Sequence, residues 1–148
     1  FRNLHRALEG LAGVGNLVVS NLGAVDQPDI VPEIADLLLR MEGKTWSLCT
    51  GSQGDRVYAS IRTTNPRADA GNLMRRLIGT LGKGGGHGTM AGGFVGIPRT
   101  AADGGKAIER MLAQRFAKAL GRNPERLQPI DLDAVALDTP APPESLAS

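Results

Sequence analysis

Cysteine, aromatic residues and long apolar runs are all scarce in this sequence. The single cysteine, Cys49, excludes an intramolecular disulfide and a CxxC metal motif, and it fits a reducing compartment. No apolar segment approaches the roughly 18 residues that a membrane-spanning helix needs, so we expect no membrane association. Aromatic residues make up only 3% of the chain, which argues against a broad stacking surface for long single strands of nucleic acid.

The length of 148 residues corresponds to about one domain, at roughly 150 residues per domain. The chain begins at Phe1 rather than Met, without a basic segment followed by an apolar one. We therefore expect a cytoplasmic location, and we interpret the chain as part of a longer protein.

Glycine and positive charge are concentrated in the middle of the chain. Residues 56–99 carry seven Lys or Arg against Asp69 alone, while the segments before and after are slightly acidic. The glycine-rich stretch 82–93 lies within this basic region. Glycines that allow close backbone approach, beside cations, suit a phosphate or another anion. For Arg75 and Arg76, the alternative is a solvated helix face.

Hydrophobic periodicity predicts an α/β (α+β) fold, with a mixed sheet of about five strands and helices on both faces. We expect helices over about 3–11, 30–41, 69–81 and 103–120, and strands over about 17–19, 45–50, 56–62 and 94–97. Asp69 is a suitable cap for the third helix, and Gly82 a suitable end. On the strand 56–62, the alternation places Arg62 on the less apolar face.

This pattern divides the chain into three segments. Residues 1–15 are expected to be a linker or the end of a helix from an upstream domain, and residues 16–121 the folded domain. Residues 122–148 are rich in proline and are expected to form an irregular tail.

The strongest functional signal is the segment 82–93, which we expect to be a loop. Three consecutive glycines, Gly84, Gly85 and Gly86, precede His87, and Gly88 and Thr89 follow. Backbone N–H groups in such a loop can converge on an oxyanion, an imidazole can donate to a phosphate oxygen, and Arg62 can supply a forked donor pair. The alternative is a flexible loop with one exposed histidine.

Other motifs fail on spacing or context. The Gly86-x-Gly88-x-x-Ala91 segment follows an expected helix rather than a strand, so it does not fit a dinucleotide fingerprint. Gly43-Lys44-Thr45 lacks the first glycine of a P-loop. His5, Cys49 and His87 have no metal-ligand spacing, so we expect no metal site in this chain.

The segment Ser60-Ile61-Arg62, followed by Gly84-Gly85-Gly86-His87 and the small residues after it, resembles the C-terminal DHHA domain of the DHH phosphoesterases. The resemblance implies that His87 and Arg62 bind substrate phosphate, with Gly84, Gly85 and Gly86 as a cradle. It also implies a separate upstream DHH domain that holds Mn²⁺ and hydrolyses nucleotides, short oligonucleotides or cyclic dinucleotides.

This chain lacks the Asp- and His-rich metal motifs of such a catalytic domain, so we expect it to bind no cofactor and to be inactive alone. Two alternatives remain open. One is a nucleic-acid-binding module of a larger protein, as in the related appendage of alanyl-tRNA synthetases. The other is a structural domain that mediates self-association, for example as a homodimer.

Overall fold

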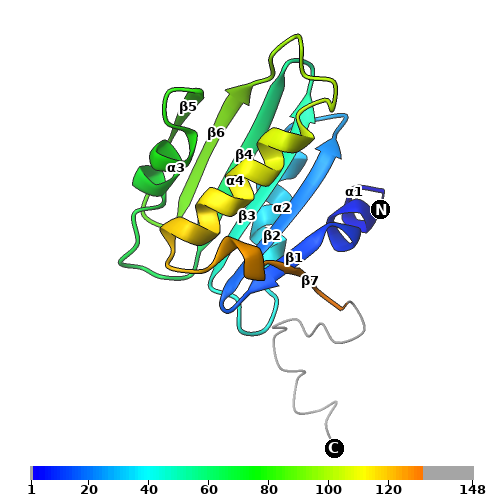
Figure 1. Cartoon of the computed structure of the whole chain (residues 1–148). Coiled ribbons are helices and arrows are strands. Elements are labelled where there is room, and N and C mark those ends of the chain that lie inside the picture. The colour runs from blue at the N-terminus through cyan, green and yellow to red at the C-terminus, as the bar shows by residue number, and fades with distance from the viewer. Residues whose placement is uncertain (1, 132–148) are drawn as a thin grey trace, which may run out of the picture.

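Two segments that alternate apolar and polar residues form the middle of a seven-stranded sheet. They are β3 (Trp46–Gln53) and β4 (Arg56–Thr63), which pair antiparallel across the tight turn at Gly54 and Asp55. This computed structural model describes residues 2–131, and Figure 1 shows the sheet with helices on both of its faces. The predicted fold class is therefore confirmed, although the sheet has seven strands rather than about five.

The sheet is mixed, with the strand order β5-β6-β4-β3-β2-β1-β7. Among the strands of residues 2–131, only β2 and β3 pair in parallel, and α2 (Ile30–Leu38) connects them. The other neighbouring strands pair antiparallel. The remaining strands are β1 (Leu11–Val14), β2 (Leu17–Ala24), β5 (Gly82–His87), β6 (Met90–Gly96) and β7 (Gln128–Pro129).

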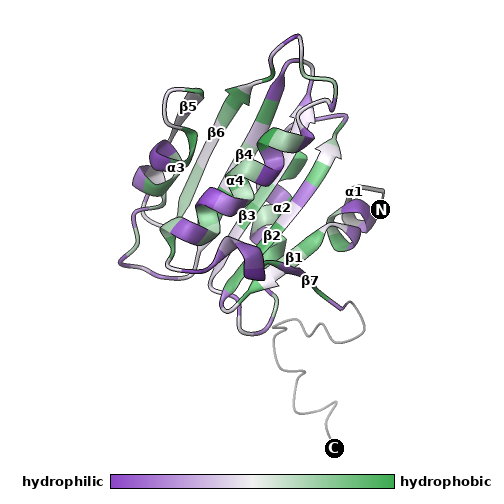
Figure 2. Ribbon diagram, in the orientation of Figure 1, coloured by the Kyte–Doolittle hydropathy of each residue, from purple (hydrophilic) through white to green (hydrophobic). Residues whose placement is uncertain are grey.

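Each face of the sheet has its own hydrophobic core. One face packs against α3 (Ala70–Ile78) and α4 (Lys106–Ala119), whose fully buried side chains include Leu77 and Phe116. The other packs against α1 (Arg2–Glu9) and α2, around Val31 and Ile34. Figure 2 shows hydrophilic and hydrophobic residues alternating along α3 and α4.

One edge of the sheet contains strands from outside the expected domain range of 16–121. β1 lies before it, and the short strand β7 pairs with β1 after the single turn η1 (Pro124–Arg126). The rest of the expected proline-rich tail, from residue 132, lies outside the described residues. Within residues 2–131, no helix is long and apolar enough to cross a membrane.

The segment 82–93 forms a β-hairpin, so the prediction of a loop was wrong. β5 and β6 pair from Gly82 opposite Val95 to His87 opposite Met90. α3 ends earlier than predicted, at Ile78, and Gly79 rather than Gly82 follows it, with φ +57°. The helix begins as predicted, because the Asp69 side chain accepts a hydrogen bond from the N–H of Asn72.

Candidate functional site

The strand pairing brings Arg62 and His87 onto the same face of the sheet. Both residues pair with Met90, Arg62 from β4 and His87 from β5. Laterally paired residues point to the same side of a sheet, and their backbones here are two strand spacings apart, or about 10 Å. Two residues separated by 25 positions in the sequence therefore flank one surface.

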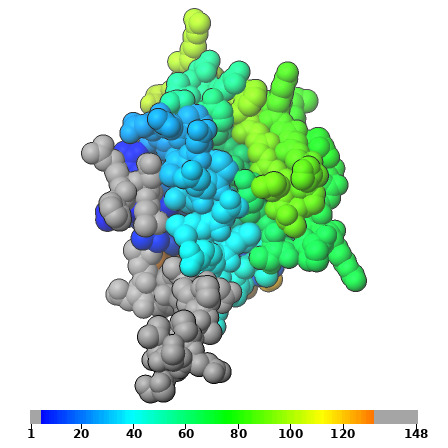
Figure 3. Space-filling view, turned by 180° about the vertical axis from the view of Figure 1, so that it is seen from behind, coloured from blue at the N-terminus to red at the C-terminus, as the bar shows by residue number. Residues whose placement is uncertain are grey.

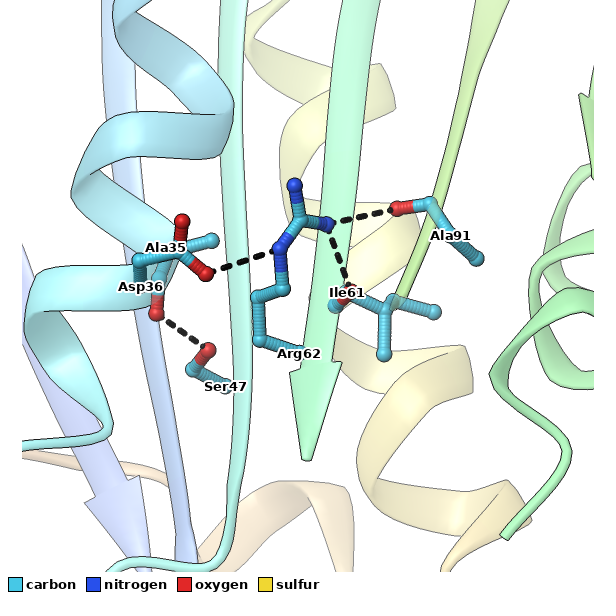
Figure 4. A network of polar contacts seen from close by, with 6 residues as sticks. All are labelled: Ala35, Asp36, Ser47, Ile61, Arg62 and Ala91. Carbon is cyan, nitrogen blue, oxygen red and sulfur yellow. Dashed lines mark hydrogen bonds and ion pairs between the residues drawn. The ribbon is translucent and has the colours of Figure 1, made fainter. Parts of the chain in front are cut away.

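Arg62 is held in one orientation by its neighbours (Figure 4). Its Nε donates to Oδ1 of Asp36 on α2 at 2.8 Å, and Nη1 donates to the carbonyl oxygens of Ile61 and Ala91 at 2.9 and 3.3 Å. The side chain is only 12% exposed. No described residue accepts a hydrogen bond from Nη2. The contacts fix the guanidinium plane while leaving one edge available to a ligand.

A cavity of about 330 Å³ lies between Arg62 and His87. Its lining includes Ser60, Arg62, Gly85, Gly86, His87 and Gly92. Figure 3 shows this side of the molecule, with the hairpin β5–β6 beside α2. The Ser60 hydroxyl lies on the same face and makes no hydrogen bond with any described residue. The cavity therefore combines one fixed guanidinium, one exposed imidazole and one hydroxyl over a floor of small residues.

Several hairpin glycines are needed by the fold itself, because another part of the chain packs where a side chain would lie. A Cβ at Gly84 would lie 2.8 Å from both Met74 and Ile78 of α3. A Cβ at Gly93 would lie 2.6 Å from the carbonyl oxygen of Lys83. A Cβ at Gly71, where α3 crosses the hairpin, would overlap the backbone of Gly86. Alanine would therefore require movement of the backbone at Gly93 and Gly71, and of the Met74 and Ile78 side chains at Gly84.

Gly85 and Gly92 are different, because nothing in the fold requires the absence of their side chains. The nearest atom to a Cβ at Gly92 would be the carbonyl oxygen of Ala59 at 3.7 Å, and at Gly85 it would be Arg75 Nη1 at 3.8 Å. Neither residue has a positive φ. They lie side by side, opposite Ser60, in the floor of the cavity. A side chain at either position would fill space that a ligand could occupy.

The structure places the expected site residues in three groups, of which the third is the turn at Gly88 and Thr89. Arg62, Gly85, Gly86 and His87 line the cavity. Gly84 instead packs against α3, as described above.

Gly88 and Thr89 form the turn of the hairpin and connect it to its neighbours. The carbonyl of Gly88 accepts from the N–H of Ala70, and that of Thr89 from the N–H of Thr63. These bonds join the turn to the start of α3 and to the end of β4.

Two charged residues lie beside the cavity: Asp36, which sequence reasoning did not identify, and Arg75, for which it left two interpretations open. Asp36 orients Arg62, although the two residues are 26 positions apart, and nothing in the local pattern of α2 distinguishes it from other exposed acidic residues. Arg75 is on α3, but its Nη1 lies near Gly85, beside the open edge of the sheet. Arg75 is exposed, as expected for a residue on a solvated helix face, but it also adds positive charge close to the cavity.

The described residues do not offer a metal centre. Within residues 2–131, no three His, Cys, Asp or Glu side chains gather closely enough to hold a metal ion. Cys49 is buried, and burial together with the Glu109 carboxylate raises the pKa of its thiol far above the usual range. This thiol is therefore a poor ligand and a poor nucleophile at neutral pH.

A larger hollow of about 550 Å³ lies on the opposite face, between α4 and η1. Its two cations are Arg115 and Lys118, and Glu125 adds a carboxylate. Arg115 already donates to the carbonyl oxygen of Leu77 at 2.7 Å. The hollow therefore combines charges of both signs.

This chain is similar to several known proteins, over different shares of its length. An uncharacterized protein of Methanocaldococcus jannaschii is 30% identical over 105 residues, which are 71% of this chain and 21% of that protein. Among solved structures, the C-Ala domain of Aquifex aeolicus alanyl-tRNA synthetase is 20% identical, with a TM-score of 0.49, over 69% of this chain and 96% of that domain.

A pGpG-specific phosphodiesterase of Vibrio cholerae is 15% identical, with a TM-score of 0.46, over 78% of this chain and 38% of that protein. An exopolyphosphatase-related protein of Bacteroides fragilis is 16% identical, with a TM-score of 0.49, over 78% of this chain and 35% of that protein.

The chain thus spans about a fifth of the curated relative that it matches. A family model gives the more specific result, because the model described as the DHHA1 domain matches residues 15–120, from the end of β1 to the end of α4. This range contains the hairpin β5–β6, Arg62 and the whole of the cavity. The chain belongs to the DHHA1 domain family.

Proposed function

We propose that this chain is the substrate-binding domain of a phosphoesterase that acts on nucleotides or short oligonucleotides. The main support is the cavity between Arg62 and His87, whose floor is formed by two glycines that the fold does not require. Membership of the DHHA1 family agrees with this role. In this proposal, Gly85 and Gly92 are glycines because the phosphate or sugar of a ligand lies against their backbone.

Each cavity residue has a distinct role in the proposal. The Nη2 edge of Arg62 donates to phosphate oxygens, and the Asp36 contact keeps that edge aimed into the cavity. The His87 ring N–H donates from the other side, and the Ser60 hydroxyl donates from the floor. Charge-assisted hydrogen bonds of this kind are about twice as strong as neutral ones. The domain thereby fixes the position of one phosphate, as a reaction at the neighbouring ester bond requires.

The hydrolytic chemistry would come from outside the described residues, since they gather no set of three metal ligands. The Mn²⁺ ions and the attacking water belong, in this proposal, to a separate DHH domain of a longer protein. We expect this chain alone to bind nucleotides without hydrolysing them.

The alternative of a nucleic-acid-binding module without catalysis uses the same cavity. The surface that favours it is the exposed sheet beyond the cavity, where Arg56 and Lys83 add positive charge. A module for long strands predicts an affinity that rises steadily with oligonucleotide length, whereas a nucleotide clamp predicts a plateau after two or three nucleotides. Calorimetric titration with adenine oligonucleotides of one to eight residues separates the two.

The proposed phosphate contacts are tested with Arg62→Ala and His87→Ala in the 148-residue chain, titrated with a 5′-phosphorylated adenine dinucleotide. Loss of a hydrogen bond to a charged group is worth about 1.5–3 kcal/mol, so each variant should raise Kd by at least about tenfold. Arg126→Ala is the matched control, because Arg126 is exposed on η1. Unchanged affinity in both cavity variants would reject the proposed function.

A further inference from the structure

The open face of the sheet continues from the cavity along β4 and β6. Side chains alternate along a strand, so Tyr58 lies on the same face as Arg62, and Phe94 on the same face as Met90. Tyr58 and Phe94 pair directly across the two strands, with ring centroids 6.5 Å apart. Both side chains are partly exposed. In a chain with 3% aromatic residues, two of them therefore lie together on the face that carries the cavity.

Arg56 adds a third flat group to this surface. Its guanidinium lies 4.0 Å from the centroid of the Phe94 ring, in cation–π contact. Arg56 is exposed, and no described residue forms a hydrogen bond or an ion pair with its guanidinium. The guanidinium is thus positioned against the Phe94 ring. Nucleobases stack on aromatic side chains and on arginine planes of this kind.

The separation from the phosphate cavity indicates which part of a ligand reaches this surface. Tyr58 is four residues from Arg62 along β4, and Phe94 is four residues from Met90 along β6, which is about 13 Å in each case. The rise of one stacked nucleotide is only about 3.4 Å. The surface is several times this rise away from the cavity, so a base on it belongs to a further nucleotide of an extended chain, not to the nucleotide whose phosphate occupies the cavity.

We propose that Arg56 and Phe94, with Tyr58 beside them, form a stacking platform for a nucleobase, so that the ligand is a chain of at least two nucleotides. The proposal rests on the proposed function and specifies its substrate class. Lys83 pairs with Phe94 on β5 and is exposed, which places a cation next to the platform. The positive charge of Arg56 and Lys83 complements the phosphate that links two nucleotides.

The test compares adenosine monophosphate with the 5′-phosphorylated adenine dinucleotide on the 148-residue chain and on Phe94→Leu. Leucine keeps the apolar contact of the half-buried ring with the sheet but removes the flat surface. Because stacking is worth about 1–3 kcal/mol per base, the variant should raise the Kd of the dinucleotide about 5- to 150-fold. The Kd of the mononucleotide, bound through its phosphate, should change less than twofold.

A fluorescent dinucleotide containing 2-aminopurine gives a direct readout of stacking, since its emission falls when the base stacks. We expect quenching with the wild-type chain, less with Arg56→Gln, and none with Phe94→Leu. Arg126→Gln is the control for loss of one positive charge, because it removes an exposed arginine on η1. Arg56→Gln also keeps the test decisive if Phe94→Leu does not fold.

The outcomes separate the platform from the phosphate site. If Phe94→Leu and Arg56→Gln bind the dinucleotide as tightly as the wild type does, or lose both ligands equally, the platform is rejected while the phosphate site stands. If His87→Ala and Arg62→Ala leave dinucleotide affinity unchanged, the phosphate site itself is rejected. Quenching that persists in Phe94→Leu would place the base elsewhere and overturn the inference.

Discussion

Gly92 and Gly93 are adjacent on β6, point to opposite faces of the sheet, and should respond in opposite ways to substitution by alanine. A Cβ at Gly92 would enter the cavity and approach no atom closer than 3.7 Å. A Cβ at Gly93 would lie 2.6 Å from the Lys83 carbonyl oxygen and 2.9 Å from the Cα of Gly84, both of which are backbone atoms. One substitution therefore affects the ligand, and the other affects the fold.

The expected changes in the free energy of unfolding follow from the typical effects of such substitutions in proteins. Gly92→Ala removes conformational freedom from the unfolded chain and should raise the free energy of unfolding by up to about 1 kcal/mol. Gly93→Ala overpacks the contact with β5 and α3 and should lower it by about 1–3 kcal/mol. For a chain of this size, each kcal/mol corresponds to about 2–4 °C in Tm. The two variants should therefore differ in Tm by several degrees.

Two assays measure the effects on stability and on ligand binding separately. Urea unfolding is followed by the fluorescence of Trp46, whose ring packs edge-on against Phe116 at 6.4 Å and reports on the core. Dinucleotide binding is measured by calorimetry at a temperature at which both variants are folded. Gly92→Ala should be at least as stable as the wild type, with Kd raised about tenfold or more. If Gly92→Ala binds normally, or is destabilised as much as Gly93→Ala, our explanation of the hairpin glycines is wrong.

Three further predictions address charge, reactivity and packing. Arg75→Gln should raise the Kd of the dinucleotide about two- to fivefold at low salt and change it little at 0.5 M salt, because exposed charges interact weakly and are screened by salt. The control variant Arg76→Gln should raise this Kd less than Arg75→Gln does. Cys49 should resist iodoacetamide at pH 8 in the folded chain and react once urea unfolds it, since burial and Glu109 raise the pKa of the thiol. Because unfolding lets the thiol ionise, the free energy of unfolding should decline as the pH rises above the ordinary pKa of a thiol. Rapid labelling of the folded chain would contradict this prediction. Phe116→Ala should lower the free energy of unfolding by about 3–5 kcal/mol, because the ring is fully buried, and a loss below 1 kcal/mol in urea unfolding would argue against the packing of α4 on the sheet.

The helices and the central hairpin could be predicted because their side chains carry a period. The apolar stripes of α3 and α4 follow helical spacing, and the alternation of β4 correctly places Arg62 on the face opposite Ile61. The Gly121 residue that ends the last helix has φ +78°, as expected of a residue in this position.

The strand β5 and the first half of β6 could not be predicted in this way, whereas the strand expected over about 94–97 overlaps the end of β6. A run of glycines has no alternation of apolar and polar residues, so the sequence pattern gives no sign of a strand. The reason for these glycines lies in the tertiary structure, since α3 crosses the hairpin so closely that Gly71 faces the backbone of Gly86. The strands β1 and β7 are only 4 and 2 residues long, and so short a segment also lacks a clear period.

The candidate site was accessible to sequence reasoning only in part. Arg62 and His87 were named from their motifs, and the strand register places both beside one cavity. The separate roles of Gly84 and Gly85 depend on which face each residue occupies, and three identical residues in a row do not reveal that. Asp36 acts through a contact across the sheet that no local pattern records.

The most direct test of the central claim is an NMR titration of the ¹⁵N-labelled chain with the 5′-phosphorylated adenine dinucleotide. We expect the largest shifts at the backbone amides of Gly85 and Gly92, at the Arg62 side chain and at the His87 ring, and little change at the hollow beside α4. Shifts confined to Arg115 and Lys118, or no shifts at millimolar dinucleotide, would contradict the account.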